Sequence, residues 1–189
     1  MEAYPATGRL TGLMHETAED LAELQGLLDR SFANAGGHLL SIFDADRRMD
    51  AEQLSETLTG MRLLNLATVT AKGEPRVGPV DGHFHRGCFY FGSSPESFRF
   101  KHIRARPAVS AAHTVGEQLA VIVHGTAVVL DVMADEHAPF RQQLRETYGS
   151  DPAFADYLQK HSMDWDDWFA DALYARIDAQ KMFTFRSGV

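Results

Sequence analysis

Apolar positions in the first sixty residues recur at helical spacing. One face of a predicted helix carries the apolar residues Leu21, Leu24, Leu28 and Phe32. Thr17 can cap the start of this helix, and the Gly36-Gly37 pair is a stop signal. A second, shorter helix is predicted from Asp50 to about Leu58, because Asp50 and Gln53 stand at the reciprocal positions of a capping box.

The pattern changes to that of β-strands after residue 60. Extended segments are predicted at 63–70, 76–81, 88–91, 108–112 and 119–131, with a last strand pair at 174–177 and 182–185. Lys72-Gly73-Glu74-Pro75 reads as a hairpin turn, and Gly125 inside the long strand suggests a bulge. Several strands at short spacing with few helices between them predict an antiparallel barrel or sandwich.

Two helical segments interrupt the strands, one from Pro139 to Gly149 and one that begins at Asp151-Pro152. The following stretch, 164–169, joins acidic residues to Trp165 and Trp168. An amphipathic helix with its aromatic residues packed inward is favoured there over a substrate wall. We therefore predict one α+β domain with an N-terminal helical extension (1–60), barrel strands (61–132), a helical insertion (133–172) and closing strands (173–189).

Composition restricts the possible partners. The 189 residues carry a net charge of −8, with 44% hydrophobic and 23% charged residues, which is typical of a soluble globular protein. The acidic balance argues against a nucleic-acid partner, and no apolar run reaches the roughly 20 residues that span a membrane. The first residues lack a signal-peptide pattern, and the single Cys88 excludes an intramolecular disulfide. We expect a cytoplasmic protein.

A basic segment stands out in this acidic chain. Four cations fall within eight residues, preceded by Ser93, Ser94 and Ser97; they are Arg99, Lys101, Arg104 and Arg106. Hydroxyl groups together with guanidinium and ammonium groups suit a bound phosphate. A solvated helix face explains the same pattern equally well, and Arg104 and Arg106 are the members that fit it best.

Histidines are the other candidates for chemistry. His83 and His85 share one face of a predicted strand. A metal site needs a third ligand, and none stands at a recognisable spacing, so we predict no metal and interpret the pair as the lining of a pocket or interface. His102, His113 and His124 lie among apolar neighbours, as structural histidines usually do.

The stretch from Leu63 to Leu130, with a fainter match at 174–186, resembles the flavin-binding split β-barrel family, the pyridoxamine 5′-phosphate oxidase-like proteins. The resemblance rests on the order of LATVTAKGEPRVGPVD, FYFGSSPESFRFKHIRARPAVSAA and VHGTAVVL. Members of this family often carry Ser-x-Lys-x-Arg-Asn-Leu before a basic segment and a proline. The corresponding residues here are Ser97, Arg99, Lys101, His102 and Ile103, ahead of Pro107.

The resemblance implies a homodimer with two cofactor sites at the subunit interface. The cofactor would be FMN or the deazaflavin coenzyme F-420, and the activity hydride transfer to or from a small organic substrate. A haem-binding protein and a flavin-binding protein without turnover remain alternatives. The implied cofactor-binding residues are Arg76, Val77, Gly78, Pro79, Val80, Ser93, Ser94, Ser97, Arg99, Lys101 and His102. The candidates for a substrate pocket are Asp81, His83, His85, Trp165 and Trp168, and no catalytic acid or base is assigned.

Three departures from the family pattern change what is expected. Arg99 replaces the usual lysine, and Asp81 stands where the pyridoxamine phosphate oxidases carry a lysine after the second strand. Their C-terminal signature of Trp and Arg is not clear in ALYARIDAQKMFTFR. We therefore do not expect vitamin B6 oxidation.

Overall fold

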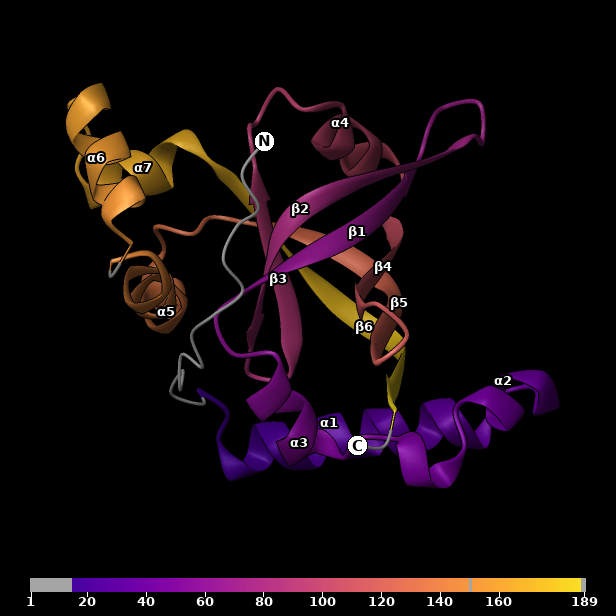
Figure 1. Ribbon diagram of the computed structural model, residues 1–189. Coiled ribbons are helices and arrows are strands. Elements are labelled where there is room, and N and C mark those ends of the chain that lie inside the picture. Colours follow the sequence, from indigo (N-terminus) through magenta and orange to yellow (C-terminus); the bar gives the residue numbers. More distant parts are fainter. Residues whose placement is uncertain (1–14, 150, 188–189) are drawn as a thin grey trace.

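The computed structural model describes residues 15–149 and 151–187, and its centre is a closed antiparallel barrel (Figure 1). The strands follow one another around the barrel in the order β1-β2-β3-β6-β5-β4. Their bounds are β1 Met61–Val69, β2 Pro75–His85, β3 Cys88–Ser93, β4 Ala108–Val115, β5 Leu119–Leu130 and β6 Leu173–Arg186. The predicted α+β fold with an antiparallel barrel, an N-terminal helical extension and a helical insertion is confirmed.

The hairpin of β1 and β2 forms as its sequence predicts. Its turn contains Gly73 at a φ of +81°, a conformation that glycine adopts without steric cost. Pairing runs without a break from Val69 opposite Pro75 to Met61 opposite His83. Strand β2 meets its other neighbour, β3, only from Gly82 to His85. Among the described residues, the segment 76–81 therefore has a strand on one edge only.

The C-terminal strand corrects the sequence interpretation. We predicted a pair of strands at 174–177 and 182–185, but β6 runs unbroken from Leu173 to Arg186. It pairs with β5 along its length, and a register shift at His124/Gly125 takes up the extra residue. A Cβ at Gly125 would collide with the carbonyl oxygen of Asp178, so this bulge needs glycine. Residues 178–181, which lie between the two predicted strands, belong to β6 and lie beside the bulge.

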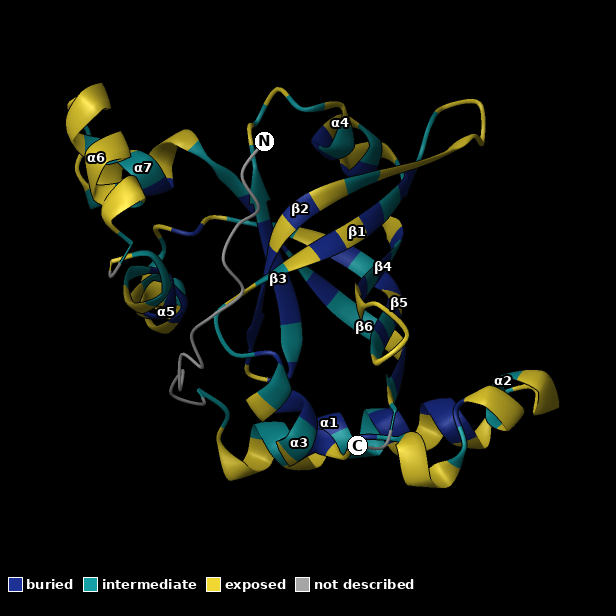
Figure 2. Cartoon of the chain, in the orientation of Figure 1, coloured by how far each residue is buried: buried dark blue, intermediate teal, exposed yellow. Residues whose placement is uncertain are grey.

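Buried residues gather inside the barrel and at the end that the helical extension covers, and a second group lies under the helical insertion (Figure 2). Phe84, Phe89 and Phe91 contribute rings from β2 and β3, each no more than 3% exposed. Leu54 and Leu58, both 0% exposed, belong to the same core although they come from the helical extension. The extension is therefore part of the domain's core and not an appendage.

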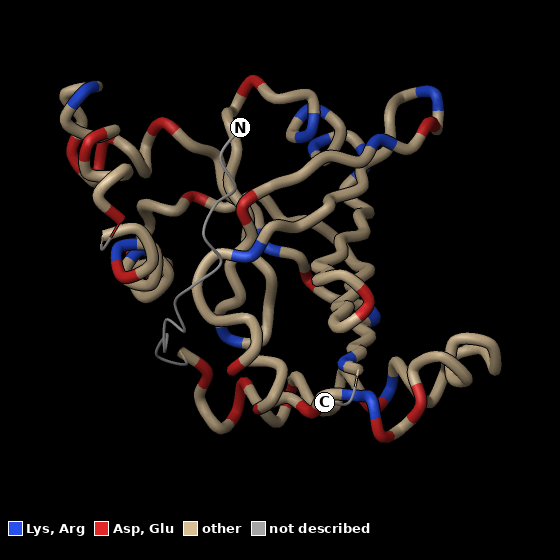
Figure 3. Tube along the Cα trace, in the orientation of Figure 1, with Lys and Arg blue, Asp and Glu red and all other residues tan. Residues whose placement is uncertain are grey.

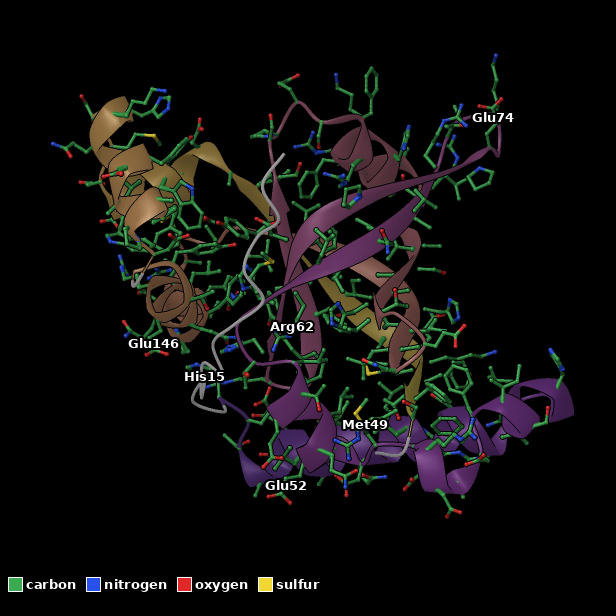
Figure 4. The ribbon with its side chains drawn as sticks, in the orientation of Figure 1. His15, Met49, Glu52, Arg62, Glu74 and Glu146 are labelled. Atoms are coloured by element: carbon green, nitrogen blue, oxygen red, sulfur yellow. The ribbon has the colours of Figure 1, made fainter. Side chains whose placement is uncertain are left out.

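The helical extension lies across one end of the barrel. It consists of α1 (Ala18–Ala33), α2 (Gly37–Ile42), a 3-10 turn η1 (Ala45–Arg47) and α3 (Ala51–Thr57). The predicted cap at Thr17 and the predicted capping box at Asp50 are both formed, and Asp20 completes a capping box at Thr17 as well. Met49 lies between this layer and the barrel (Figure 4), where its backbone N–H donates to Thr184 Oγ1 at 2.9 Å and its carbonyl accepts from the same hydroxyl at 3.1 Å.

The helical insertion covers the outer face of β2, β3 and β6. It contains a 3-10 turn η2 (Asp135–His137), α5 (Ala138–Tyr148), α6 (Pro152–His161) and α7 (Trp165–Asp171). Phe140 of α5 packs on Tyr90 of β3, with ring centroids 4.4 Å apart, and Phe169 of α7 is fully buried. This agrees with the predicted inward-packed helix. No helix in the described ranges is both long and apolar enough to cross a bilayer.

His83 and His85 share the outer face of β2, as predicted, and α5 buries both. The Nδ1 atom of His85 lies 2.6 Å from Gln143 Oε1, and Gln143 Nε2 donates to the carbonyl oxygen of Phe84 at 2.7 Å. Burial disfavours the charged imidazolium and lowers the pKa of His83 to about 3 and that of His85 to about 4.

We predict that these histidines make the fold acid-sensitive. In the unfolded chain both take up protons below pH 6.5, whereas in the folded chain they do so only near pH 3 to 4. The contribution of the neutral histidines to the free energy of unfolding is therefore fully present above pH 6.5. It falls as the pH drops from 6.5 toward the folded-state pKa values, by about 1.4 kcal/mol per pH unit for each histidine. Urea unfolding of wild type and His85→Gln between pH 7 and 4.5 checks this. The variant keeps an amide group that can donate a hydrogen bond to Gln143. Because it lacks one of the two titrating imidazoles, its free energy of unfolding should fall less steeply with decreasing pH than that of wild type, by the contribution of one proton. Equal slopes would contradict the prediction.

Candidate functional site

Helix α4 (Phe98–Ala105) carries the basic segment and lies against the open edge of β2. Ser97 caps it by accepting a hydrogen bond from the backbone N–H of Phe100 at 3.4 Å. Phe100 and Ile103 are buried at 0% and 1% exposure, and the Phe100 ring stacks on Phe91 of β3. This anchoring fixes the face of the helix that carries Arg99.

Arg99 is bound to the barrel by two hydrogen bonds. Its Nη1 donates to Ser93 Oγ at 2.9 Å, and its Nη2 donates to the carbonyl oxygen of Pro79 at 3.0 Å. A Cβ at Gly78 would come within 3.2 Å of Nη2, so the absence of a side chain lets the guanidinium lie against β2. One turn further along the helix, His102 Nδ1 lies 2.9 Å from Thr68 Oγ1.

A cavity of about 450 Å³ lies between α4 and the β1–β2 hairpin; we name it the α4 cavity. Its lining residues are Leu66, Thr68, Thr70, Arg76, Val77, Gly78, Phe98, Arg99 and His102. The polar part of this lining consists of two guanidinium groups, threonine side chains and an imidazole. The side chains of Val77 and Phe98, which are 69% and 77% exposed, line the cavity as well.

The α4 cavity carries positive charge that is only partly neutralised. Arg76 pairs with Glu74 at 2.7 Å, at the tip of the hairpin (Figure 4). Within the described ranges Arg99 has no carboxylate within 4 Å, and burial lowers its pKa from the usual value. Figure 3 shows Lys and Arg gathered on α4 and on the adjoining hairpin. Such a desolvated, unpaired guanidinium favours an anionic ligand.

Other implied cofactor-binding residues lie outside the α4 cavity. Lys101 turns away from the α4 cavity toward Glu96, at 3.7 Å, and sits over the ring of Phe98. Ser97 is occupied by its capping role, and Ser94 Oγ accepts from the backbone N–H of Glu96 at 3.3 Å. Val80 is 5% exposed and belongs to the barrel core.

A second cavity, of about 530 Å³, opens on the other side of Ser93; we name it the β2–α7 cavity. Of the predicted substrate-pocket residues, Asp81, His83 and Trp168 line it. His85 is covered by α5, and Trp165 packs against Phe154 and Phe169. The structure therefore brings three of the five together.

Other lining residues were not singled out from the sequence. The β2–α7 cavity also contains Tyr148 from α5, Tyr174 from β6 and Asp171 from α7. In the sequence, Tyr148 falls within the helical segment predicted from Pro139 to Gly149 and Tyr174 at the start of a predicted strand, and neither is assigned to a site. Their meeting depends on how the insertion docks on the barrel, which leaves no local signal.

A third cavity, of about 600 Å³, lies between α1 and the segment from α2 to α3. Its cation, Arg48, already donates to the carbonyl oxygen of Phe43 at 2.9 Å and sits 4.2 Å from the ring centroid of Phe32. The carboxylates of Asp29 and Asp50 line the same cavity and offset the charge of Arg48, so the described lining offers an anionic ligand no net positive charge.

Comparison with known proteins places the fold. No protein-family model matches the chain, and no curated protein matches it. Among solved structures, a conserved hypothetical protein from Mycobacterium tuberculosis is 19% identical, with a TM-score of 0.59 over 75% of this chain and 88% of that one. An FAD-binding protein from Mesorhizobium loti is 23% identical, with a TM-score of 0.51 over 76% and 97%.

The haem storage protein HutZ from Vibrio cholerae is also similar, at 17% identity and a TM-score of 0.51 over 66% of this chain and 86% of that one. At these identities the likeness concerns the fold alone. The chain has the split β-barrel fold of the pyridoxamine 5′-phosphate oxidase-like proteins, as its sequence resemblance predicted.

Proposed function

We propose that this protein binds a flavin or deazaflavin cofactor and transfers hydride to or from a small organic substrate. The observation that carries the proposal is Arg99, a desolvated guanidinium without a carboxylate partner in the described ranges, held between two cavities. One cavity suits the anionic part of a cofactor and the other has room for a substrate.

The residues present fit a flavin phosphate. Arg76, Arg99 and the hydroxyl of Thr70 line the α4 cavity, and guanidinium groups bind phosphate through paired hydrogen bonds. Between the cavities, no strand of residues 15–149 or 151–187 pairs with one edge of residues 76–81, so backbone groups there have no ladder partner in these ranges. Such groups suit the polar edge of a planar ring. A flavin or deazaflavin supplies hydride chemistry, while the protein binds and orients the reactants.

We also propose a homodimer with the cofactor near the interface. Leu63 on β1 is 52% exposed and Val77 on β2 is 69% exposed, and both lie on the outer face of the hairpin. Exposed apolar side chains gathered on one sheet face are typical of a protein interface. The single free thiol, Cys88, is consistent with the reducing cytoplasm that we propose as the location.

The first prediction concerns cofactor identity. Absorbance titration of the purified protein with FMN, coenzyme F-420 and haem should show binding of FMN or F-420 below about 100 μM, which corresponds to ~5.5 kcal/mol. If a donor then reduces the bound cofactor, the protein acts as an enzyme; if no donor reduces it, the protein acts as a storage protein. Binding of haem alone would replace the proposal with the haem-binding alternative.

The second prediction concerns Arg99. We expect Arg99→Glu to weaken cofactor binding at least 10-fold, about 1.4 kcal/mol, because it puts a carboxylate where the phosphate would lie. Arg106→Glu makes the same charge change at the end of α4, outside the α4 cavity, and should change affinity less than 3-fold. Equal losses in the two variants would show that the basic segment acts only as a solvated face.

The third prediction concerns the dimer. Leu63→Asp places a charge on the outer face of the hairpin and should shift sedimentation equilibrium toward monomer by at least 10-fold in the dissociation constant. Ile42→Asp alters an equally exposed apolar residue on α2, far from the hairpin, and should leave the dimer intact. A wild-type protein that sediments as a monomer would refute this part of the proposal.

A further inference from the structure

The β2–α7 cavity has a chemistry of its own, distinct from that of the α4 cavity. Its walls come from β2, the end of β3 with the loop after it, the start of β6, and helices α5 and α7, whose arrangement Figure 1 shows. At about 530 Å³ it has the size of a small-ligand site. Because the helical insertion supplies one wall, the properties of this cavity depend on residues outside the stretch that resembles the family.

Hydrogen bonding in the wall leaves one acceptor unused. Tyr148 donates its hydroxyl proton to Asp81 Oδ2 at 3.4 Å and lies 3.2 Å from His83 Nε2. Because a carboxylate only accepts, both contacts are hydrogen bonds only if His83 Nε2 carries a proton and donates to Tyr148. His83 Nδ1 is then a bare acceptor, and it is buried without a hydrogen-bond partner in the described ranges. A donor on a ligand would satisfy it.

The titratable groups of the wall give the cavity a negative charge. His83 is neutral, because burial lowers its pKa to about 3. Burial and the charge of Asp81 raise the pKa of both Tyr148 and Tyr174 well above the usual range, so both keep their protons. The charged lining residues are then Asp81, Asp171 and Glu96.

These carboxylates differ in how far they are neutralised. The exposed Glu96 pairs with Lys101 at 3.7 Å. In the described ranges neither Asp81 nor Asp171 has a Lys, Arg or His within 4 Å. Arg99 contacts the shared wall at Ser93, but it lines the α4 cavity, and the part of the chain that the structure describes contributes no Lys or Arg to the lining of the β2–α7 cavity.

Aromatic rings complete the wall. Tyr148 and Trp168 meet edge to face, with centroids 5.4 Å apart, and Tyr174 lies beside them in the lining. Ring faces attract organic cations, most strongly when carboxylates stand nearby and water is displaced. An anionic ligand would meet unpaired carboxylates instead.

We propose that the β2–α7 cavity binds a small planar organic cation that also carries an N–H or O–H donor, with Asp81 and Asp171 supplying the charge, Tyr148 and Trp168 the ring contacts, and His83 the acceptor. That the bound cation is the substrate rests on the proposed function. That the cavity binds a cation does not depend on it. Phosphorylated and carboxylated substrates are disfavoured.

The test uses three probes that share one ring and differ in charge: 1-methylnicotinamide (cation), nicotinamide (neutral) and nicotinate (anion). Isothermal titration calorimetry of the full-length protein at pH 7.5 should give at least 10-fold tighter binding of the cation than of nicotinate. Asp81→Asn removes a charge without changing shape and should weaken cation binding about 10-fold while changing nicotinamide binding less than 2-fold. Asp171→Asn, at an exposed position on α7, should act in the same direction and carries little risk to folding.

Asp156→Asn provides the matched control, because this exposed residue on α6 lies outside the cavity and the net charge changes equally. The proposal is overturned if nicotinate binds as tightly as the cation, if the cation does not bind at millimolar concentration, or if Asp156→Asn weakens cation binding as much as Asp81→Asn does. A parallel FMN and F-420 titration separates the two proposals. Binding of the cation without binding of a cofactor would contradict only the proposed function. Binding of a cofactor without preference for the cation would contradict only the proposal for the β2–α7 cavity.

Discussion

Strand β2 pairs with β1 from Pro75 to His83, but with β3 only from Gly82 to His85. The backbone of residues 76–81 must therefore find other partners, since unpaired polar groups are costly to bury. Helix α4 lies along this edge, and Arg99 provides part of the answer by donating to the carbonyl oxygen of Pro79. Both cavities next to the barrel border the place where β2 and β3 separate, so the candidate site follows from this single feature of the sheet.

The two helical regions stabilise the barrel in different ways. The N-terminal layer is bound to β6 through buried hydrogen bonds, from Thr184 to Met49 and from the backbone N–H of Met182 to Ser31 Oγ at 2.9 Å. The insertion packs instead through aromatic rings and through two histidines that burial keeps neutral. The first arrangement closes one end of the barrel, while the second adds a wall to a cavity. The insertion therefore contributes side chains to the β2–α7 cavity, whereas the N-terminal layer contributes none to either candidate cavity in the described ranges.

Charge is divided between the cavities in the same way. The α4 cavity contains two arginines, whereas the β2–α7 cavity has unpaired carboxylates in the described ranges. The two cavities are nevertheless close neighbours, because Ser93 lines the β2–α7 cavity and accepts a hydrogen bond from Arg99 of the α4 cavity. A net charge of −8 hides this division, because it averages over the whole surface. Opposite local fields so close together suit two ligands of opposite charge held side by side.

The sequence by itself determined the local elements of this protein. Capping residues at Thr17 and Asp50, the turn around Gly73 and the bulge at Gly125 act through near neighbours or through backbone geometry, so each was readable from a few residues. The predicted strand pair left out residues 178–181, because the pairing with β5 that continues β6 through them leaves no local signal. Membership of the cavities was decided by the tertiary structure alone. Lys101 and Arg99 stand two residues apart in one basic segment, yet the anchoring of Phe100 turns one toward solvent and the other toward β2. Tyr148 meets Asp81 across 67 positions of sequence, and such a contact depends on packing between elements that no local pattern records.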